Sequence, residues 1–240
     1  MIQRIAVAVA LTLAPAAFAQ TYIVPDGSCG AVTLHATRGA DFPKLGATIP
    51  ADQVKSAWVS NSPSRGFDPG VQSWRLAMKP IPAAHSLDFT TNVDAHDEVV
   101  GASVDFLPVV SGNETRTDHA KAFIYCGATV PMADWQRDTG LGLEIYPQWN
   151  GTRQRMKQGD EMRFIAVDRS SKKLLQDVPM YLYRAGAGRI AEGVPSKNGG
   201  MTFSFPEPGR YMLMTTYRRA DPQKPEHWLV DSSTLTFEVR

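Results

Sequence analysis

One segment of the chain is dense in side chains that bind metal ions. Asp94 and His96 stand two residues apart, so in extended backbone both would project from one face and could chelate a divalent ion. His119, which follows Asp118, could join them from the next strand. The predicted metal ligands are therefore Asp94, His96, His85 and His119, with Asp88, Asp97 and Glu98 beside them in the sequence.

The same segment also fits a solvated acidic loop between two strands, which is the commoner origin of such a cluster. The residues alone leave both interpretations open. His35 and His227 fit surface positions better than ligand positions.

Two cysteines predict a disulfide if the protein is exported, because oxidising compartments favour the bond. Cys29 follows a turn-like stretch at 25–28, and Cys126 ends the alternating segment 120–126. A closed loop of about 100 residues would stabilise the fold by up to about 4.7 kcal/mol in the chain-entropy model. No C-x-x-C motif or adjacent basic side chain points to a reactive thiol instead.

The start of the chain predicts export. Arg4 precedes an apolar run at 5–16, and Ala17, Phe18 and Ala19 form an A-x-A cleavage site before Gln20. We expect residues 1–19 to be a signal peptide, removed between Ala19 and Gln20, and the mature protein to be periplasmic. The run is shorter than the roughly 20 residues of a spanning helix, and no transmembrane segment is expected in the mature chain.

Charge and composition describe an ordinary folded protein. Lys and Arg number 25 against 24 Asp and Glu, so no basic excess favours a nucleic-acid partner. Hydrophobic residues make up 43% of the chain and charged residues 20%, which is typical of globular proteins.

No catalytic motif is present, so no catalytic residue is predicted and the chain is not expected to be an enzyme. Residues 186–191 match G-x-G-x-x-A, but Pro195, Gly199 and Gly200 follow too soon for the helix that a dinucleotide needs. We expect a glycine-rich hairpin or loop there. Elbow, zincin and P-loop signatures do not occur in the sequence. A catalytic group assembled from distant loops stays open.

The apolar residues alternate along most of the chain, which predicts an all-β protein with two β-sandwich domains. An N-terminal sandwich is expected over 20–138 and an immunoglobulin-like sandwich over 139–240, with the boundary near Thr139. A turn or two of helix is expected at 51–56. The predicted strands are 32–37, 57–60, 74–78, 87–93, 99–107, 121–126, 143–146, 161–168, 178–184, 201–205, 211–217 and 234–239.

Four stretches of the C-terminal half carry a resemblance to a known family: 139–147 (TGLGLEIYP), 159–160 (GD), 206–213 (PEPGRYML) and 232–239 (SSTLTFEV). They resemble the DUF4198 family of exported bacterial proteins, which is associated with periplasmic components of nickel and cobalt uptake. The resemblance implies a divalent transition metal, nickel or cobalt, as ligand. It also implies an uptake transporter or outer-membrane receptor as partner.

The start of the expected mature chain departs from the family pattern. Family members often place a histidine just ahead of an aromatic-Leu-x-Pro segment. Here residues 19–25 read AQTYIVP, so Tyr22, Ile23 and Pro25 occupy the aromatic, apolar and proline places without a histidine before them.

Two function classes follow. The preferred one is a periplasmic, non-enzymatic binding or accessory protein that serves transition-metal uptake. The alternative is a cell-envelope module that contacts protein or polysaccharide without a dedicated small ligand. Sandwich folds host both classes, so the fold does not choose between them.

Overall fold

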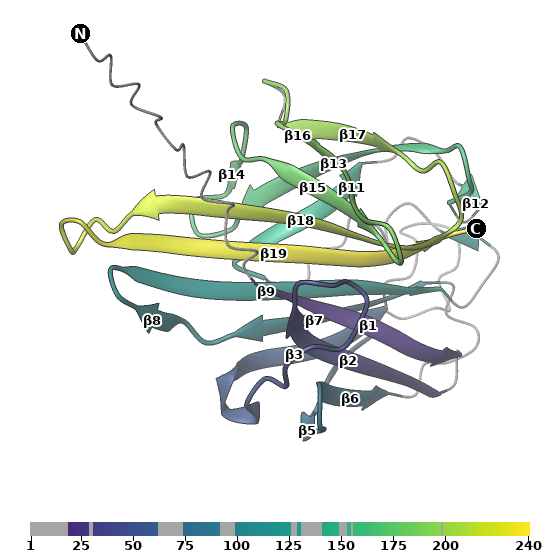
Figure 1. The fold of residues 1–240 in the computed structure, drawn as a ribbon, viewed down its shortest axis with the longest axis horizontal. Helices are drawn as coiled ribbons and strands as arrows, with labels where there is room; N and C mark the ends of the chain where they lie inside the picture. Colours follow the sequence, from purple (N-terminus) through teal and green to yellow (C-terminus); the bar gives the residue numbers. More distant parts are fainter. Residues whose placement is uncertain are drawn as a thin grey trace, which may run out of the picture.

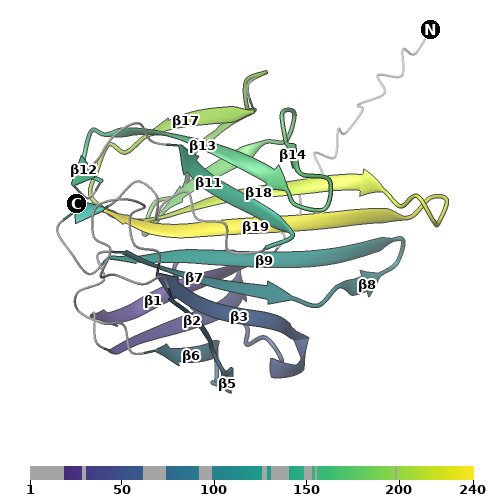
Figure 2. The same ribbon diagram turned by 180° about the vertical axis from the view of Figure 1, so that it is seen from behind.

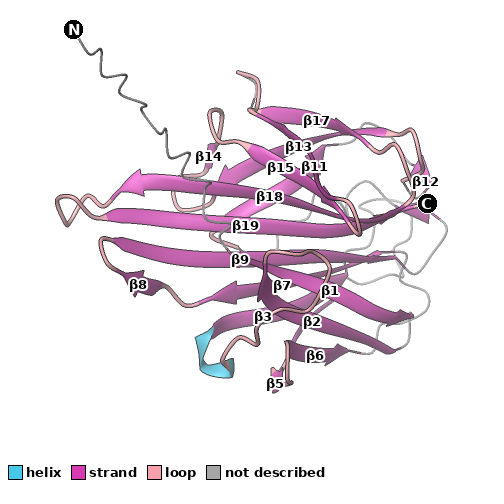
Figure 3. Cartoon of the chain, viewed as in Figure 1, coloured by secondary structure: helices cyan, strands magenta, loops and turns pink. Residues whose placement is uncertain are grey.

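The computed structural model describes residues 19–28, 31–61, 74–91, 99–125, 129–130, 141–148, 153–154, 156–197 and 199–240. Strands dominate this part of the chain, and its helical content is one 3-10 turn, η1 (Ala51–Gln53) (Figure 3). No helix of these residues is long and apolar enough to cross a membrane.

A nine-stranded sheet forms the centre of the molecule (Figure 1). Its order is β16 (Gly188–Gly193), β15 (Met180–Arg184), β18 (Gly209–Ala220), β19 (Trp228–Val239), β9 (Glu114–Tyr125), β7 (Val99–Phe106), β3 (Val54–Asn61) and β4 (Trp74–Ala77), and β8 (Val109–Ser111) pairs with β9. Strands β9 and β19 pair in parallel, whereas the other neighbours are antiparallel. The central sheet therefore takes strands from both halves of the chain.

Two four-stranded sheets cover the central sheet. One has the order β1 (Gln20–Ser28), β2 (Ala31–Gly39), β6 (Leu87–Thr91) and β5 (Ile81–Pro82). The other contains β11 (Leu143–Gln148), β13 (Glu161–Asp168), β14 (Lys173–Leu174) and β17 (Gly200–Ser204), and β10 (Thr129–Val130) pairs separately with β12 (Arg153–Gln154). The two covering sheets lie at opposite ends of the central sheet (Figures 1 and 2).

The alternating side chains of β9 explain how one sheet contributes to two hydrophobic cores. Ala120 and Ala122 pack with β2, β3, β6 and β7 in the N-terminal core, whereas Phe123 packs in the C-terminal core with β11, β13 and β18. Successive side chains of a strand point to opposite faces. The two covering sheets therefore lie on opposite faces of the central sheet, and the molecule consists of two sandwiches that share it.

Strand β1 packs where the two sandwiches meet. Tyr22 and Val24 form a small third cluster with Phe42 of the loop after β2 and Met212 of β18. The Thr234 hydroxyl of β19 also donates a hydrogen bond to the Thr21 carbonyl at 2.8 Å. The N-terminal sheet is thus fastened to strands from the far end of the chain.

The all-β prediction is confirmed, and so is the layered sandwich arrangement. Strand β13 has the predicted bounds 161–168, and the glycine-rich stretch is a β15–β16 hairpin with positive φ at Gly186 and Gly188. The expected helix at 51–56 is shorter, because Val54 already pairs with Phe106 of β7.

Several predictions fall outside the described residues. They concern residues 1–18 of the leader predicted at 1–19, both cysteines, Cys29 and Cys126, and the boundary near Thr139. These stay predictions.

Candidate functional site

A histidine lies at the centre of the shared sheet. His119 of β9 faces Asp105 of β7 in the antiparallel register, and its Nδ1 lies 2.5 Å from Asp105 Oδ1. The two side chains are 3% and 5% exposed. A buried ionisable side chain requires a polar or charged partner, and His119 and Asp105 are partners of one another across adjacent strands.

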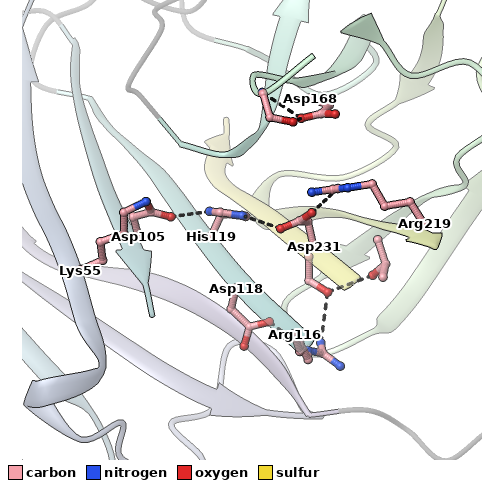
Figure 4. Close-up of polar contacts among 11 residues, drawn as sticks. Lys55, Asp105, Arg116, Asp118, His119, Asp168, Arg219 and Asp231 are labelled. Carbon is pink, nitrogen blue, oxygen red and sulfur yellow. Dashed lines mark hydrogen bonds and ion pairs between the residues drawn. The ribbon is translucent and has the colours of Figure 1, made fainter. Parts of the chain in front are cut away.

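The pair extends in both directions along the sheet (Figure 4). Asp231 of β19 lies with Oδ1 3.5 Å from His119 Nε2, and Arg219 of β18 forms a hydrogen-bonded ion pair with the same carboxylate. On the other side, Lys55 Nζ lies 3.1 Å from Asp105 Oδ2. Lys55 is the residue at which the β3–β7 register shifts, and such a bulge redirects a side chain. We call Lys55, Asp105, His119, Asp231 and Arg219 the central charge chain.

The carboxylates of the central charge chain raise the pKa of His119 and keep it protonated at neutral pH. Burial alone would lower the pKa of His119, but the hydrogen bonds to Asp105 and Asp231 and their negative charges outweigh it and raise the pKa to about 9. Burial likewise opposes the ionisation of Asp105, yet His119 and Lys55 hold its pKa below the usual range. Both ring nitrogens of His119 therefore act as hydrogen-bond donors at neutral pH.

Asp168, at the end of β13, is close enough to Arg219 to feel its charge, and Figure 4 shows it to one side of the Asp231–Arg219 pair. Burial alone would raise the pKa of Asp168. Hydrogen bonds from Ser170 and Ser171 and the charge of Arg219 outweigh burial and hold the pKa below its usual range. The Ser170 amide and hydroxyl donate to Oδ1 at 2.9 and 2.7 Å. Asp168 therefore organises the turn after β13.

A second buried pair joins the central sheet to the C-terminal covering sheet. Lys121 Nζ of β9 donates to Glu144 Oε1 of β11 at 2.7 Å, and neither side chain is more than 1% exposed. The Tyr146 hydroxyl donates to Glu144 Oε2 at 2.9 Å, and Lys121 Nζ lies 4.9 Å from the centre of the Tyr146 ring. Burial and the Glu144 charge raise the pKa of Tyr146, so its hydroxyl stays a donor.

A third cluster lies on the opposite face of β9. Asp118 is 5% exposed and accepts hydrogen bonds from Thr21 at 2.6 Å, Arg116 at 3.0 Å and Arg38 at 3.2 Å. The Arg116 guanidinium also donates to the Ser232 hydroxyl at 3.2 Å. Beside this cluster lies a cavity of about 170 Å³, lined by Ala19, Arg38, Phe106, Leu107, Val109, Ser111, Arg116 and Asp118.

The structure does not bring the two described predicted ligands together. His85 is exposed at the turn before β6, in the sheet that packs on Ala120 and Ala122, whereas His119 points to the other face of β9. Asp88 instead bonds to His35 Nδ1 at 2.7 Å. Asp94 and His96 lie outside the described residues. Within the residues that are described, no three His, Cys, Asp or Glu side chains are grouped to hold a metal ion.

The central charge chain was not predicted from the sequence. The available signal was the polar run at 114–119 before the apolar part of β9, which was not assigned to a strand. A partner such as Asp231, 112 residues away, leaves no local pattern.

Comparisons with known proteins do not assign this chain to a family. No family model matches the chain, and no curated protein matches it. Among solved structures it is similar to trypsin-activated alpha-2-macroglobulin from Escherichia coli, with 13% identity and a TM-score of 0.27 over 92% of this chain. The chain spans 17% of the length of that protein. A likeness at this level carries no argument about function.

Proposed function

We propose that this protein is an exported binding protein of the cell envelope that performs no chemistry of its own. The observation that carries the proposal is the central charge chain. Its members pair with one another across five strands and join the two sandwiches. Because these side chains already bond to one another, we assign them to stabilising the fold and not to binding a substrate.

His119 illustrates the point. A general base must reach the proton that it takes, and a metal ligand must offer a neutral nitrogen. His119 is buried, has a partner at each ring nitrogen, and has a pKa that these partners raise to about 9, which favours the protonated form at neutral pH. Gly142 lies against the ring, since a Cβ added there would sit 2.8 Å from His119 Cε1. His119 therefore supports a structural role and neither a catalytic nor a metal-binding one.

The sequence supports export and, more narrowly, a role in the uptake of a transition metal. The expected leader at 1–19 and the resemblance to the DUF4198 family favour a periplasmic protein that serves nickel or cobalt uptake with a transporter or outer-membrane receptor. The strand spacing over 139–240 supports an immunoglobulin-like C-terminal sandwich. The metal assignment depends on Asp94 and His96.

Exposed apolar residues near the cavity favour the second candidate, a module that contacts another macromolecule. Val109 and Val110 of β8 are 42% and 67% exposed, and Leu107 just before them is 43% exposed. Apolar side chains gathered on one hairpin are a feature of interaction surfaces.

Isothermal titration of the exported protein with Ni²⁺, Co²⁺, Zn²⁺ and a panel of small organic anions tests the proposal. We expect saturable binding of at least one of these, with the ligand recovered chemically unchanged. Recovery of a product, or no binding across both panels, would overturn it.

A variant pair separates the metal assignment from general metal affinity. If nickel binds, Asp94→Asn combined with His96→Gln should abolish binding. His227→Gln is the matched control, because its ring bonds to Thr115 at 2.8 Å, and it should bind nickel as the wild type does. Nickel binding that survives the double substitution would remove these two residues as ligands.

A further inference from the structure

We infer that the cavity beside Asp118 binds a small carboxylate that carries a short apolar chain. The inference rests on the proposed binding function and names the class of ligand. It uses the cavity lined by residues of or next to β2, β7, β8 and β9, and no predicted metal ligand is among the described lining residues. Ala19 also lines the cavity but leaves with the predicted leader, so in the mature chain the other seven lining residues form the site.

The charges of the cavity favour an anion. Its lining contains two guanidiniums, Arg38 and Arg116, and one carboxylate, Asp118, which leaves one positive charge in excess. Asp118 already accepts three hydrogen bonds, so a ligand cation would find little acceptor capacity there. Arg38 is one-third exposed and is among the residues that line the cavity. Guanidinium groups bind carboxylates through paired, charge-assisted hydrogen bonds.

The remaining walls favour a short apolar chain. The lining contains the buried Phe106 and the exposed Leu107 and Val109. Ser111 also lines the cavity. A water molecule needs about 10–15 Å³ of such space, so a cavity of about 170 Å³ has room for roughly ten water-sized groups. It therefore accommodates a short carboxylic acid of a few carbon atoms.

The register of the β8–β9 hairpin provides a matched pair of test positions. Val109 pairs with Arg116 and lines the cavity, whereas Val110 pairs with Thr115 and is not among the lining residues. Both valines are exposed, so an aspartate at either position should leave the core unchanged. Only the aspartate at 109 would place a negative charge at the site.

Titration calorimetry of the exported protein with butyrate tests the inference, with butyramide as the uncharged control. We expect saturable one-to-one binding of butyrate with Kd at or below about 1 mM, and none of butyramide. Val109→Asp should weaken binding at least about tenfold, because a like charge lies beside the carboxylate. Val110→Asp should bind within about twofold of the wild type.

A free acid and the end of a peptide offer the same chemistry, so acetyl-glycyl-valine is titrated in parallel. Tighter binding of this peptide than of butyrate assigns the site to a peptide carboxyl terminus, and the reverse order assigns it to a free acid. Failure of both to bind, or an equal effect of the two aspartates, would overturn the inference. A metal ion bound in the separate metal titrations would still support the proposed function.

Discussion

His119 of β9 and Asp231 of β19 are 112 residues apart in the sequence, and their Nε2 and Oδ1 atoms lie 3.5 Å apart where the two sandwiches join. Strands β9 and β19 are the parallel pair of the central sheet. The contact therefore joins the two halves of the chain through a charged interaction as well as through backbone hydrogen bonds.

Replacing His119 should destabilise the whole protein. His119→Gln removes the positive charge between Asp105 and Asp231 and leaves the buried Asp105 with Lys55 as its one cationic partner among the described residues. Breaking a buried pair on one side costs about 3–5 kcal/mol of unfolding free energy. Urea denaturation followed by circular dichroism measures the loss. His85→Gln, at an exposed histidine, should change stability by less than about 0.5 kcal/mol, and equal losses in the two variants would contradict the structural role.

Alkaline pH should weaken the fold through the same residue. The pKa of His119 is raised from 6.5 to about 9, so the folded state binds this proton more tightly than the unfolded state. The stabilisation is fully present below pH 6.5 and is lost as the pH rises through about 9. It amounts to about 3 kcal/mol.

Thermal unfolding of wild type and His119→Gln between pH 6 and 10 isolates this contribution. The difference in Tm should shrink as the pH rises, because the wild type alone loses the charged histidine. A difference that stays constant over the whole range would show that the protonation of His119 does not stabilise the fold.

The Lys121–Glu144 pair should behave as a buried ion pair. Glu144→Gln leaves the Lys121 charge buried without its carboxylate and should cost about 3–5 kcal/mol. The combination Lys121→Met, Glu144→Leu and Tyr146→Phe removes all three polar groups and should cost less than Glu144→Gln alone. Chemical denaturation measures both. Glu192→Gln, which breaks the exposed Arg189–Glu192 pair, is the control, with an expected change below about 1 kcal/mol. A greater loss in the triple variant would be contrary to this account.

Gly142→Ala should destabilise the protein through His119. The new methyl group would lie 2.8 Å from the His119 Cε1 atom, and the ring is held at both nitrogens. Overpacking of this kind costs about 1–3 kcal/mol. In a His119→Ala background the space is free, so the same substitution should cost much less. Additive losses in this double-mutant cycle would show that the two positions are not coupled.

Much of the fold could be predicted from local alternation. Strand β13 has one buried face, and its alternating apolar residues predict bounds that the structure reproduces. Strand β1 was missed because Pro25 and Gly27 interrupt its pattern, yet Pro25 is tolerated in a strand at the edge of its sheet. The parallel pairing of β9 with β19 could not be predicted, since it joins segments more than 100 residues apart.

The candidate site was harder to predict than the fold. A histidine beside an aspartate drew attention to 118–119 as a possible metal ligand, but alternation sends the two side chains to opposite faces of β9. Asp118 belongs to the cavity and His119 to the central charge chain. Such roles depend on partners from β1, β7 and β19, which no local spacing reveals.

The central claim is that the charged residues at the middle of the sheet join two sandwiches into one unit. Native-state hydrogen exchange of wild type and His119→Gln tests it most directly, read at the backbone amides of β7 and β18, one from each half of the chain. We predict that both strands open with the same free energy in the wild type, and that the substitution lowers it by the same amount in both. A loss confined to one strand, or two separate unfolding transitions in the wild type, would contradict the claim.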